Sequence, residues 1–513
     1  MKCRTAGEKG MVTRGGFIAS LAATALCGAT RNSLAENAFP ALRFGVLSDV
    51  HMSSDAETAD LIKALSWFDG KRVDAVLIAG DLCTWGKIVE LEAFARAWYR
   101  VFPNDRRSDG VKVERLFVTG NHDVDGFAYP GAGFHNEDEA RPRSFYYQRE
   151  DVWRRLFGEE YRPVSVKHVK GYAFVLRNWL SILGHDEFEG KWDRFEDEPN
   201  PLAGVMAGLE LPDDRPFFYV QHDPIDDTVN ATWLVGGSKW NNGQDRGEAM
   251  SVLRNYPNCF AFTGHSHNSL TDPRSIWQKT FTAVNCSALT GWAFTPPGRE
   301  NGFSSPDFRR DPPMEMPPVD IRSVRQGMLV DVWTDRVELA RHDFVHDVPV
   351  GEPWIVPLYG ARTVPLEGLG KYDFKRRSSL DAVPSFPADA VVTARRVPLG
   401  RRRAKDRPID GFVSCAQVVV SFPSVTRLVG SSVRAYDFSV KCESRDGDVT
   451  RIVDERRVFS PGALQAEEFD REDCRCCFPD EVVPHGVDVR FVVAPMNVWG
   501  RAGKPLASAW LKL

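Results

Sequence analysis

The stretch FVTGNHD at residues 117–123 decides how this sequence is interpreted. An apolar run ends in Thr-Gly and is followed at once by an amide, an imidazole and a carboxylate. The same arrangement returns in FAFTGHSH at residues 260–267, where two histidines follow the glycine. Glycine allows a tight backbone turn where a strand stops, and imidazoles are acid–base groups and metal ligands. Both stretches therefore predict a buried strand that ends in chemically active side chains.

Six short apolar runs in the first 290 residues have this character. They are 42–48, 74–80, 115–120, 217–221, 259–264 and 280–285. The runs are continuously apolar rather than alternating, which is typical of strands buried on both faces. Amphipathic stretches such as 57–70 and 87–100 lie between them, so the pattern indicates an α/β organisation. Residues 327–344 then predict a β-hairpin that turns at Thr334 and Asp335.

Potential metal ligands directly follow five of the six runs. They are Asp49 and His51, then Asp81, then Asn121 with His122 and Asp123, then His222 with Asp223, and finally His265 with His267. Five of the eleven histidines of the chain are in this group, whereas chance would scatter them. Because ligands of an open α/β sheet bind outside the carboxyl ends of its strands, we expect these side chains to converge at one edge of a single sheet.

The number and type of these donors predict more than one metal ion. These ligand-type side chains outnumber the four donors that one zinc ion needs. Mixed imidazole and carboxylate donors favour Fe, Zn or Mn over Ca or Mg. Two ions about 3.5–4 Å apart can clamp the attacking and leaving oxygens of an in-line displacement. A single strand-end carboxylate such as Asp49 could equally cap a helix, so the prediction depends on the whole set.

The ordered set D-x-H, G-D, G-N-H-D, H and G-H-x-H resembles that of the calcineurin-like metallophosphoesterase family, over residues 42 to about 344. The resemblance implies a four-layer α/β sandwich, in which two mixed β-sheets are flanked by helices. It implies a first metal ion held by Asp49, His51, Asp81 and His267. It implies a second ion held by Asp81, Asn121, His222 and His265, with Asp81 as the bridge. A hydroxide between the ions would attack phosphorus, and His122 would stabilise the transition state or protonate the leaving oxygen.

One position departs from the protein phosphatases of that family. They carry a second aspartate three residues after the G-D aspartate, and it orients the catalytic histidine; here that position is Thr84. This weakens a protein-phosphatase interpretation and leaves the orienting partner of His122 to be found. Asp123 and Asp223 are expected to cap backbone groups or to support a ligand imidazole from behind.

Substrate contacts are expected from long loops at the same edge, because such loops commonly set specificity. The candidates are His135, Trp233, Trp240 and Asn241. Residues 291–318 form a further irregular segment, which would be either a lid or a surface loop fixed by its prolines.

The first 35 residues are expected to be an export signal. A basic start precedes an apolar segment at 15–29 that is too short and too weakly apolar for a stable membrane span. Small residues then allow cleavage after Ala35. The alternatives are a disordered tail or a membrane anchor. We therefore expect an exported protein, located in the periplasm, in the cell envelope or outside the cell, in which Cys474, Cys476 and Cys477 form a disulfide or remain thiols rather than binding metal.

The composition of the chain changes near residue 350. Residues 36–350 are expected to form the metallophosphoesterase domain, and 351–379 form a Pro/Gly-rich linker. Residues 380–513 contain short, alternating, β-branched runs that predict an antiparallel all-β sandwich, similar to immunoglobulin or fibronectin type III modules. The basic cluster at 401–405 is expected to be a solvated hairpin loop.

The sequence therefore favours a metal-dependent phosphoesterase that acts on a small phosphomonoester, phosphodiester or pyrophosphate. The net charge of −5 argues mildly against a nuclease, which would need a basic groove, and against nucleic acid as the first choice of partner. The remaining alternative is a non-catalytic exported binding protein, in which metals stabilise the fold and the C-terminal sandwich grips a glycan or a protein.

Overall fold

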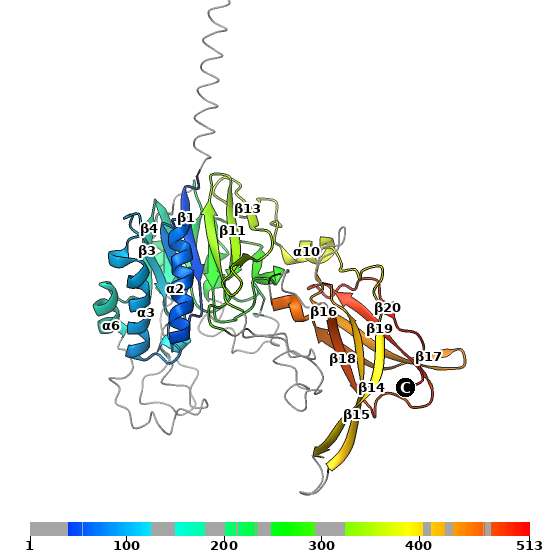
Figure 1. Ribbon diagram of the computed structural model, residues 1–513. Helices are drawn as coiled ribbons and strands as arrows, with labels where there is room; N and C mark the ends of the chain where they lie inside the picture. The colour runs from blue at the N-terminus through cyan, green and yellow to red at the C-terminus, as the bar shows by residue number, and fades with distance from the viewer. Residues whose placement is uncertain are drawn as a thin grey trace, which may run out of the picture.

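The computed structural model describes residues 39–53, 55–124, 149–179, 201–211, 214–230, 232, 248–291, 293, 324–403, 412–425, 434–464, 466 and 473–513. Two mixed β-sheets with helices form the first part of the described chain, and two smaller antiparallel sheets form the last part (Figure 1).

The first sheet has seven strands in the order β12-β11-β10-β1-β2-β3, with β13 also paired to β11. Its strands are β1 (Leu42–Leu47), β2 (Ala75–Ala79), β3 (Glu114–Val118), β10 (Gln326–Val332), β11 (Arg336–Asp343), β12 (Val348–Pro349) and β13 (Trp354–Pro357). Strands β1, β2 and β3 are parallel, while β10 joins β1 antiparallel. The three apolar runs predicted here and the predicted β10–β11 hairpin are confirmed.

The second sheet has six strands in the order β4-β5-β6-β7-β9-β8. They are β4 (Val164–Val169), β5 (Tyr172–Arg177), β6 (Phe217–Val220), β7 (Cys259–Thr263), β8 (Ile276–Gln278) and β9 (Thr282–Asn285). Strands β6, β7 and β9 were predicted by apolar runs, whereas β4, β5 and β8 were not. Strand β4 lies at the sheet edge and is only partly buried, so its sequence is mixed, but β5 is buried throughout and meets the same criterion as the strands that were found.

The two sheets pack face to face, and helices cover their outer faces. Phe44 of β1 meets Phe174 and Phe218 of the second sheet edge-on, at ring distances of 5.4 and 5.0 Å. Helices α2 (Asp55–Gly70) and α3 (Ile88–Val101) cover the first sheet, and α7 (Pro201–Ala207) and α8 (Glu248–Leu253) cover the second. Short helices α4 (Asn121–Val124) and α6 (Arg149–Phe157) complete this part. The four-layer α/β prediction is confirmed, and Figure 1 shows α2 and α3 in front of the first sheet.

The expectation of a single sheet edge is wrong. The strands that precede Asp49, Asp81 and Asn121 belong to the first sheet, whereas β6 and β7, which precede the later histidines, belong to the second. The candidate ligand groups combine residues that follow strands of both sheets, so the carboxyl ends of these strands meet at one place. The candidate site therefore lies between two sheets.

Residues 351–379 run along both sheets before they reach the C-terminal part. Strand β13 pairs with β11, and the backbone N–H of Tyr372 donates to Gln278 Oε1 at 2.9 Å. Helix α10 (Phe374–Leu380) follows, with the Asp373 carboxylate as its N-cap.

The C-terminal part is all β, as predicted. One sheet contains β14 (Thr393–Arg403), β15 (Phe412–Pro423) and β18 (Asp473–Pro479); the other contains β16 (Asp437–Asp446), β17 (Val449–Phe459), β19 (Asp488–Met496) and β20 (Leu506–Ala507). Phe422 and Phe438 meet across the core between them, with ring centroids 5.0 Å apart. The expected loop at 401–405 is wrong for Arg401–Arg403, because β15 pairs with them; residues 404 and 405 lie outside the described residues. Among the described helices, none combines the length and apolar character needed to cross a membrane.

Candidate metal centre

The ligand-type side chains from both sheets meet in two buried clusters. One consists of Asp49, His51 and His267, and the other of Asp81, His222 and His265. Within each cluster the donor atoms lie within 4.8 Å of one another. His51 and Asp81 also group with His122, so the two clusters are continuous.

Asp81 lies between the two clusters. Its Oδ2 atom is 3.1 Å from His222 Nε2 and 3.5 Å from His51 Nε2. On the first side, His267 Nε2 is 3.0 Å from Asp49 Oδ1. This is the place that a carboxylate shared by two cations would occupy.

Asn121 joins the second cluster. Its Oδ1 atom lies 3.1 Å from His222 Nε2, the same nitrogen that faces Asp81. The Nδ1–H of His222 donates to the carbonyl oxygen of Ala79 at 2.7 Å. This bond fixes the tautomer, so that Nε2 is the nitrogen that points to the cluster. All seven predicted ligands are thus brought together.

The backbone is strained at five of these seven positions. The left-handed φ angles are 50° at Asp49, 49° at His51, 51° at Asp81, 65° at His265 and 46° at His267. Such angles are uncommon for residues other than glycine and cost about 1–3 kcal/mol each. They persist only where other bonds fix them: the Asp49 N–H donates to the Gly80 carbonyl at 3.0 Å, and the His51 N–H donates to the Asp81 carbonyl at 2.9 Å. Strain of this kind concentrates at functional sites.

The glycines at the strand ends are needed for close approach. A Cβ atom on Gly120 would lie 2.2 Å from Asp81 Oδ1, and one on Gly264 would lie 1.9 Å from Ser48 Oγ. Gly80, at φ 91°, would place a Cβ 2.4 Å from His222 Nδ1. Any larger residue would displace a ligand or its support, which explains why strand after strand ends in glycine here.

The two carboxylates of the site are held in their ionised form. Burial alone would raise the pKa of the Asp49 carboxyl, but His267 and His222 outweigh it and lower that pKa below its ordinary value. Burial acts in the same way on Asp81, and there the opposing effect of His222 and His122 holds the pKa well below its ordinary value. Both groups therefore offer negative charge to a cation.

The imidazoles divide into two kinds. Burial lowers the pKa of His51 to about 3 and that of His265 to about 4, so both rings are neutral and can donate a lone pair. For His222, burial lowers the pKa, but Asp81 and Asp49 outweigh it and raise the value to about 10. A cation bound at His222 would take the place of that proton. Ionised carboxylates, neutral imidazoles and an amide oxygen together fit Fe, Zn or Mn ions.

His122 lies beside the clusters and is only half-buried. Its backbone N–H donates to Asp81 Oδ1 at 2.9 Å, and its ring centroid is 4.6 Å from that of His51. Its Nδ1 atom is 2.7 Å from the carbonyl oxygen of Thr84. With Nδ1 turned to that carbonyl, Nε2 is the nitrogen that can exchange a proton with a substrate. The orienting partner of His122 is therefore a backbone group, which no side-chain motif could have indicated.

Asp123 holds backbone groups rather than an imidazole. Its carboxylate accepts from the N–H groups of Leu82 at 3.1 Å, Cys83 at 2.8 Å and Gly120 at 2.8 Å. These bonds hold the turn after β2, which carries Asp81, against the turn after β3, which carries Asn121. Asp223 is buried, and its carbonyl accepts from Gln221 Nε2 at 2.7 Å.

Some residues around the site were not found from the sequence. Ser48 donates from Oγ to Asp49 Oδ2 at 2.5 Å, and Trp179 packs 6.0 Å from the His222 ring and 6.1 Å from the His265 ring. Ser48 directly precedes a ligand and could have been noticed, but Trp179 follows the missed strand β5. The predicted substrate contacts His135, Trp233, Trp240 and Asn241 lie outside the described residues.

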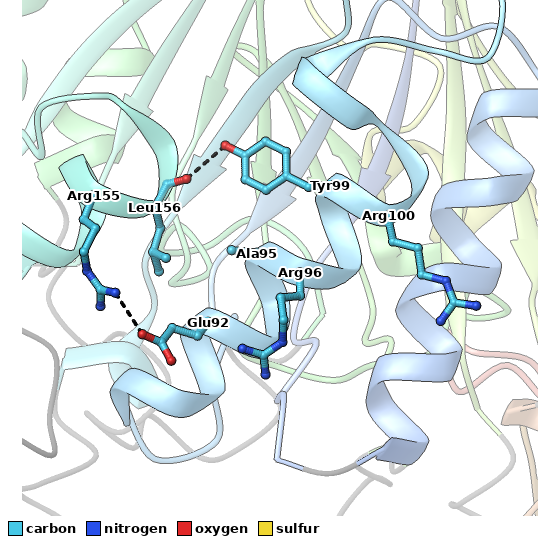
Figure 2. Close-up of a pocket in the computed structure, with 7 residues that line it drawn as sticks. All are labelled: Glu92, Ala95, Arg96, Tyr99, Arg100, Arg155 and Leu156. Carbon is cyan, nitrogen blue, oxygen red and sulfur yellow. Dashed lines mark hydrogen bonds and ion pairs between the residues drawn. The ribbon is translucent and has the colours of Figure 1, made fainter.

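A separate cavity of about 530 Å³ lies between α3 and α6 (Figure 2). It is lined by Glu92, Ala95, Arg96, Tyr99, Arg100, Arg155 and Leu156. Across it, Arg155 pairs with Glu92 at 2.9 Å and the Tyr99 hydroxyl donates to the Leu156 carbonyl at 2.9 Å. Its lining shares no residue with the two clusters, so the chemistry described above is elsewhere.

Comparisons with known proteins identify a family over part of the chain. The family described as "Calcineurin-like phosphoesterase" matches residues 42–269. No curated protein matches the chain. A dimetal phosphatase from Danio rerio is similar at 13% identity over 62% of this chain and 99% of that chain, with a TM-score of 0.36. Purple acid phosphatase PPD1 from yellow lupin (Lupinus luteus) is similar at 13% identity over 62% of this chain and 54% of that chain, also with a TM-score of 0.36. By the family match, residues 42–269 form a calcineurin-like phosphoesterase domain, and candidate metal-ligand side chains lie buried at the carboxyl ends of its strands.

Proposed function

We propose that this protein hydrolyses a small phosphate ester with two metal ions. The position of Asp81 is the observation that carries the proposal. Its carboxylate lies between a cluster with Asp49 and His51 on one side and a cluster with His222 on the other. A single ion would not need donors on both sides of this carboxylate.

The proposed ligand sets follow the two clusters. The first ion is held by Asp49, His51, Asp81 and His267, and the second by Asp81, Asn121, His222 and His265. The bound ions would be Fe, Zn or Mn, and they would supply Lewis-acid activation of water and neutralise charge on the phosphate oxygens.

His122 is the proposed catalytic residue. It lies against the His51 ring, close to both clusters, and its Nδ1 is engaged by the Thr84 carbonyl. A half-buried imidazole in this orientation presents Nε2 toward the place where a phosphoryl group would meet the two clusters. It would stabilise negative charge there or deliver a proton to the leaving oxygen.

The proposed substrate is a small phosphomonoester, phosphodiester or pyrophosphate. The acidic net charge of −5 supports a small molecule over nucleic acid. Thr84 stands where protein phosphatases of the family carry an orienting aspartate, and this also supports a small substrate over a phosphoprotein.

A hydrolysis panel on metal-quantified protein tests the proposal. The panel contains monoesters, diesters, nucleotides and phospholipid headgroups, and elemental analysis gives the metal content per chain. We expect close to two ions per chain and turnover of one ester class, which Asp81→Asn removes. Two bound ions without turnover of any ester would instead support a non-catalytic binding protein, and one ion or none would contradict the dinuclear centre.

We also propose that the C-terminal sheets form an immunoglobulin-like or fibronectin III-like module, which follows a connecting segment at 351–379.

We further propose that the chain is exported and that residues 1–35 are its cleaved signal. The basic, apolar and small-residue order of the first 35 residues supports the signal. N-terminal sequencing of protein recovered from the periplasm or the medium should begin at Glu36. Full-length protein confined to the cytoplasm would contradict it.

A further inference from the structure

The C-terminal sheets touch the metal-binding domain directly behind the last metal ligand. The contact is made by a single 3-10 turn, η7 (Pro461–Leu464), which leaves the end of β17. The Oγ of Ser269 lies 3.0 Å from the carbonyl oxygen of Leu464, and the Thr271 hydroxyl donates to the carbonyl oxygen of Ala463. Ser269 is only two residues from the proposed ligand His267, so η7 contacts the loop that carries this histidine.

Gln326, at the start of β10, ties the same loop and the same turn together. Its Oε1 accepts from the Leu270 N–H at 2.7 Å and lies 3.1 Å from Ser269 Oγ. Its Nε2 donates to the Leu464 carbonyl at 3.3 Å. The side chain is 1% exposed, so these bonds do not compete with bulk water. One buried amide therefore spans from the ligand loop to the C-terminal sheets.

The loop held in this way is one that needs support. His265 and His267 both have left-handed φ angles, of 65° and 46°. Upstream, the loop is fixed because the His265 N–H donates to both carboxylate oxygens of Asp49, at 3.1 and 3.0 Å. Downstream, the described contacts that fix it are those of Ser269, Leu270 and Thr271. Strained conformations persist only where the surroundings determine them from both ends.

The backbone of Gln326 also reaches the other ligand loop. Its N–H donates to the Ala288 carbonyl at 3.0 Å. The two residues after Ala288 continue this support: the Leu289 N–H donates to the Ser48 carbonyl at 3.0 Å, and the Thr290 N–H donates to the Asp49 carbonyl at 2.9 Å. Gln326 is thus the point where the turn η7 and the supports of two ligand loops meet.

A second contact between the two parts reaches the His222 loop. Arg274 is buried and paired with Asp272 at 2.7 Å, and its guanidinium lies 4.7 Å from the ring centroid of Tyr436 in the C-terminal part. Its Nη1 donates to the Val498 carbonyl at 3.3 Å, while its own carbonyl accepts from the Asn230 N–H at 3.1 Å. Burying a charged guanidinium costs desolvation free energy, which its pairing and stacking partners must offset. Because these partners come from both parts, the contact indicates a fixed junction between them.

We infer that the C-terminal sheets are a positioning element of the metal centre. Turn η7, acting through Thr271, Ser269 and Gln326, holds the loop after His267 in the conformation that presents His265 and His267 to the metal ions. The inference rests on the proposed function, because it assigns these two histidines to bound metal. It adds that metal affinity depends on a contact with a part of the chain that contributes no ligand.

The test compares Zn²⁺ affinity in full-length variants, measured by competition with a chromophoric chelator. Thr271→Val removes the donor to Ala463 with little change in shape, and Gln326→Leu removes the amide that joins the two parts. Each should weaken Zn²⁺ binding about tenfold, as supports behind a ligand commonly do. Thr271→Ser keeps the donor and should bind Zn²⁺ like the wild type. If Gln326→Leu fails to fold, the Thr271 pair still decides the matter.

Ser508→Ala is the matched control. The Ser508 hydroxyl is buried in the same C-terminal sheets, where it accepts from the Phe491 N–H at 3.0 Å and donates to the Ala509 carbonyl. Its loss should lower the melting temperature as Thr271→Val does, with no change in Zn²⁺ affinity. Unchanged affinity in Thr271→Val, or an equal loss in Ser508→Ala, would overturn the inference. A wild-type chain that binds none of Zn²⁺, Mn²⁺ and Fe²⁺ would overturn the proposed function along with it, whereas failure in the variants alone leaves the proposed function intact.

Discussion

The Nδ1 atom of His122 lies 2.7 Å from the backbone carbonyl oxygen of Thr84. A carbonyl fixes the tautomer and the ring plane as a carboxylate does, but it carries no full charge and stabilises an imidazolium less. The Thr84 hydroxyl is used elsewhere, since it donates to the His51 carbonyl at 2.6 Å. The His122 ring is thus oriented by the fold of the turn and not by the side chain at this position.

Thr84→Val tests this orientation. The variant keeps the backbone carbonyl and loses only the hydrogen bond to the His51 carbonyl, worth about 1 kcal/mol of stability. We expect kcat to stay within about threefold of the wild type, because His122 keeps its acceptor. Steady-state kinetics on the best ester of the panel measures this. A loss as large as that in His122→Ala would show that the side chain, and not the carbonyl, sets the ring.

His122→Ala should keep both metal ions and lose turnover. The two proposed ligand sets are complete without His122, and its Nδ1 atom is engaged by the Thr84 carbonyl, so metal content should stay at the wild-type value. General-acid catalysis typically contributes about 10²–10⁴-fold. The loss in kcat should be larger for an alkyl ester than for a nitrophenyl ester, whose leaving group needs less help from a proton. Full activity on both esters would refute the catalytic assignment.

Asp81→Asn should lower both metal content and activity. The substitution removes one negative charge from a carboxylate that faces His222 at 3.1 Å and His51 at 3.5 Å. We expect metal affinity to fall about a hundredfold or more and turnover to fall with it. Asp109→Asn is the control, because that carboxylate is on the surface, where it pairs with Arg107 and accepts from the Val111 N–H. Wild-type metal content in Asp81→Asn would be incompatible with a shared ligand.

Gly120→Ala and Gly264→Ala should damage the site through crowding alone. The new Cβ atoms would lie 2.2 Å from Asp81 Oδ1 and 1.9 Å from Ser48 Oγ. We expect a stability loss of about 1–3 kcal/mol, together with weaker metal binding. Gly204→Ala, in helix α7, meets nothing within 4 Å and should instead stabilise by up to about 1 kcal/mol. Denaturant unfolding and metal analysis on the three variants check this, and equal behaviour of all three would disprove the crowding argument.

The raised pKa of the buried Glu90 carboxyl predicts that the free energy of unfolding depends on pH. Burial raises the pKa of its carboxyl from 4.5 to about 7, against the N–H groups of Trp85 and Lys87, which donate to it at 2.8 and 3.2 Å. The charged group that faces it is Lys87, because burial raises the pKa of the Cys83 thiol well above its ordinary value and keeps that thiol neutral. Because the folded state holds this proton more tightly than the unfolded state, the contribution of Glu90 is most favourable below about pH 4.5 and is lost as the pH rises through about 7.

Glu90→Gln should therefore have little effect on the free energy of unfolding at pH 5 and raise it by about 2–3 kcal/mol at pH 8. The amide keeps an oxygen that can accept from the same two N–H groups. Urea denaturation at the two pH values gives the difference directly. A variant that is destabilised more at pH 8 than at pH 5 would contradict the assigned direction.

Much of the phosphoesterase domain followed from local patterns. Continuous apolar runs identified β1, β2, β3, β6, β7 and β9, because strands buried on both faces need no polar positions. The amphipathic stretches located α2 and α3 to within about two residues. The seven candidate ligand positions could be assigned because the motifs after these strands resemble those of a known family, and because Asp, His and Asn rarely follow so many buried strands by chance.

Other features of the site could not be predicted from the sequence, because they depend on which strands pair and on which distant backbone groups a turn contacts. The division of the ligands between two sheets is set by the packing of Phe44 against Phe174 and Phe218, and local periodicity carries no information on such contacts. The Thr84 carbonyl is a group that every residue possesses, so no residue type could mark it. The same is true of the Ala463 and Leu464 carbonyls that meet the loop after His267. Side-chain chemistry was therefore determined by the sequence itself, whereas the backbone groups that orient it were decided only when distant segments came into contact, such as those of Ser269 and Leu464, 195 residues apart.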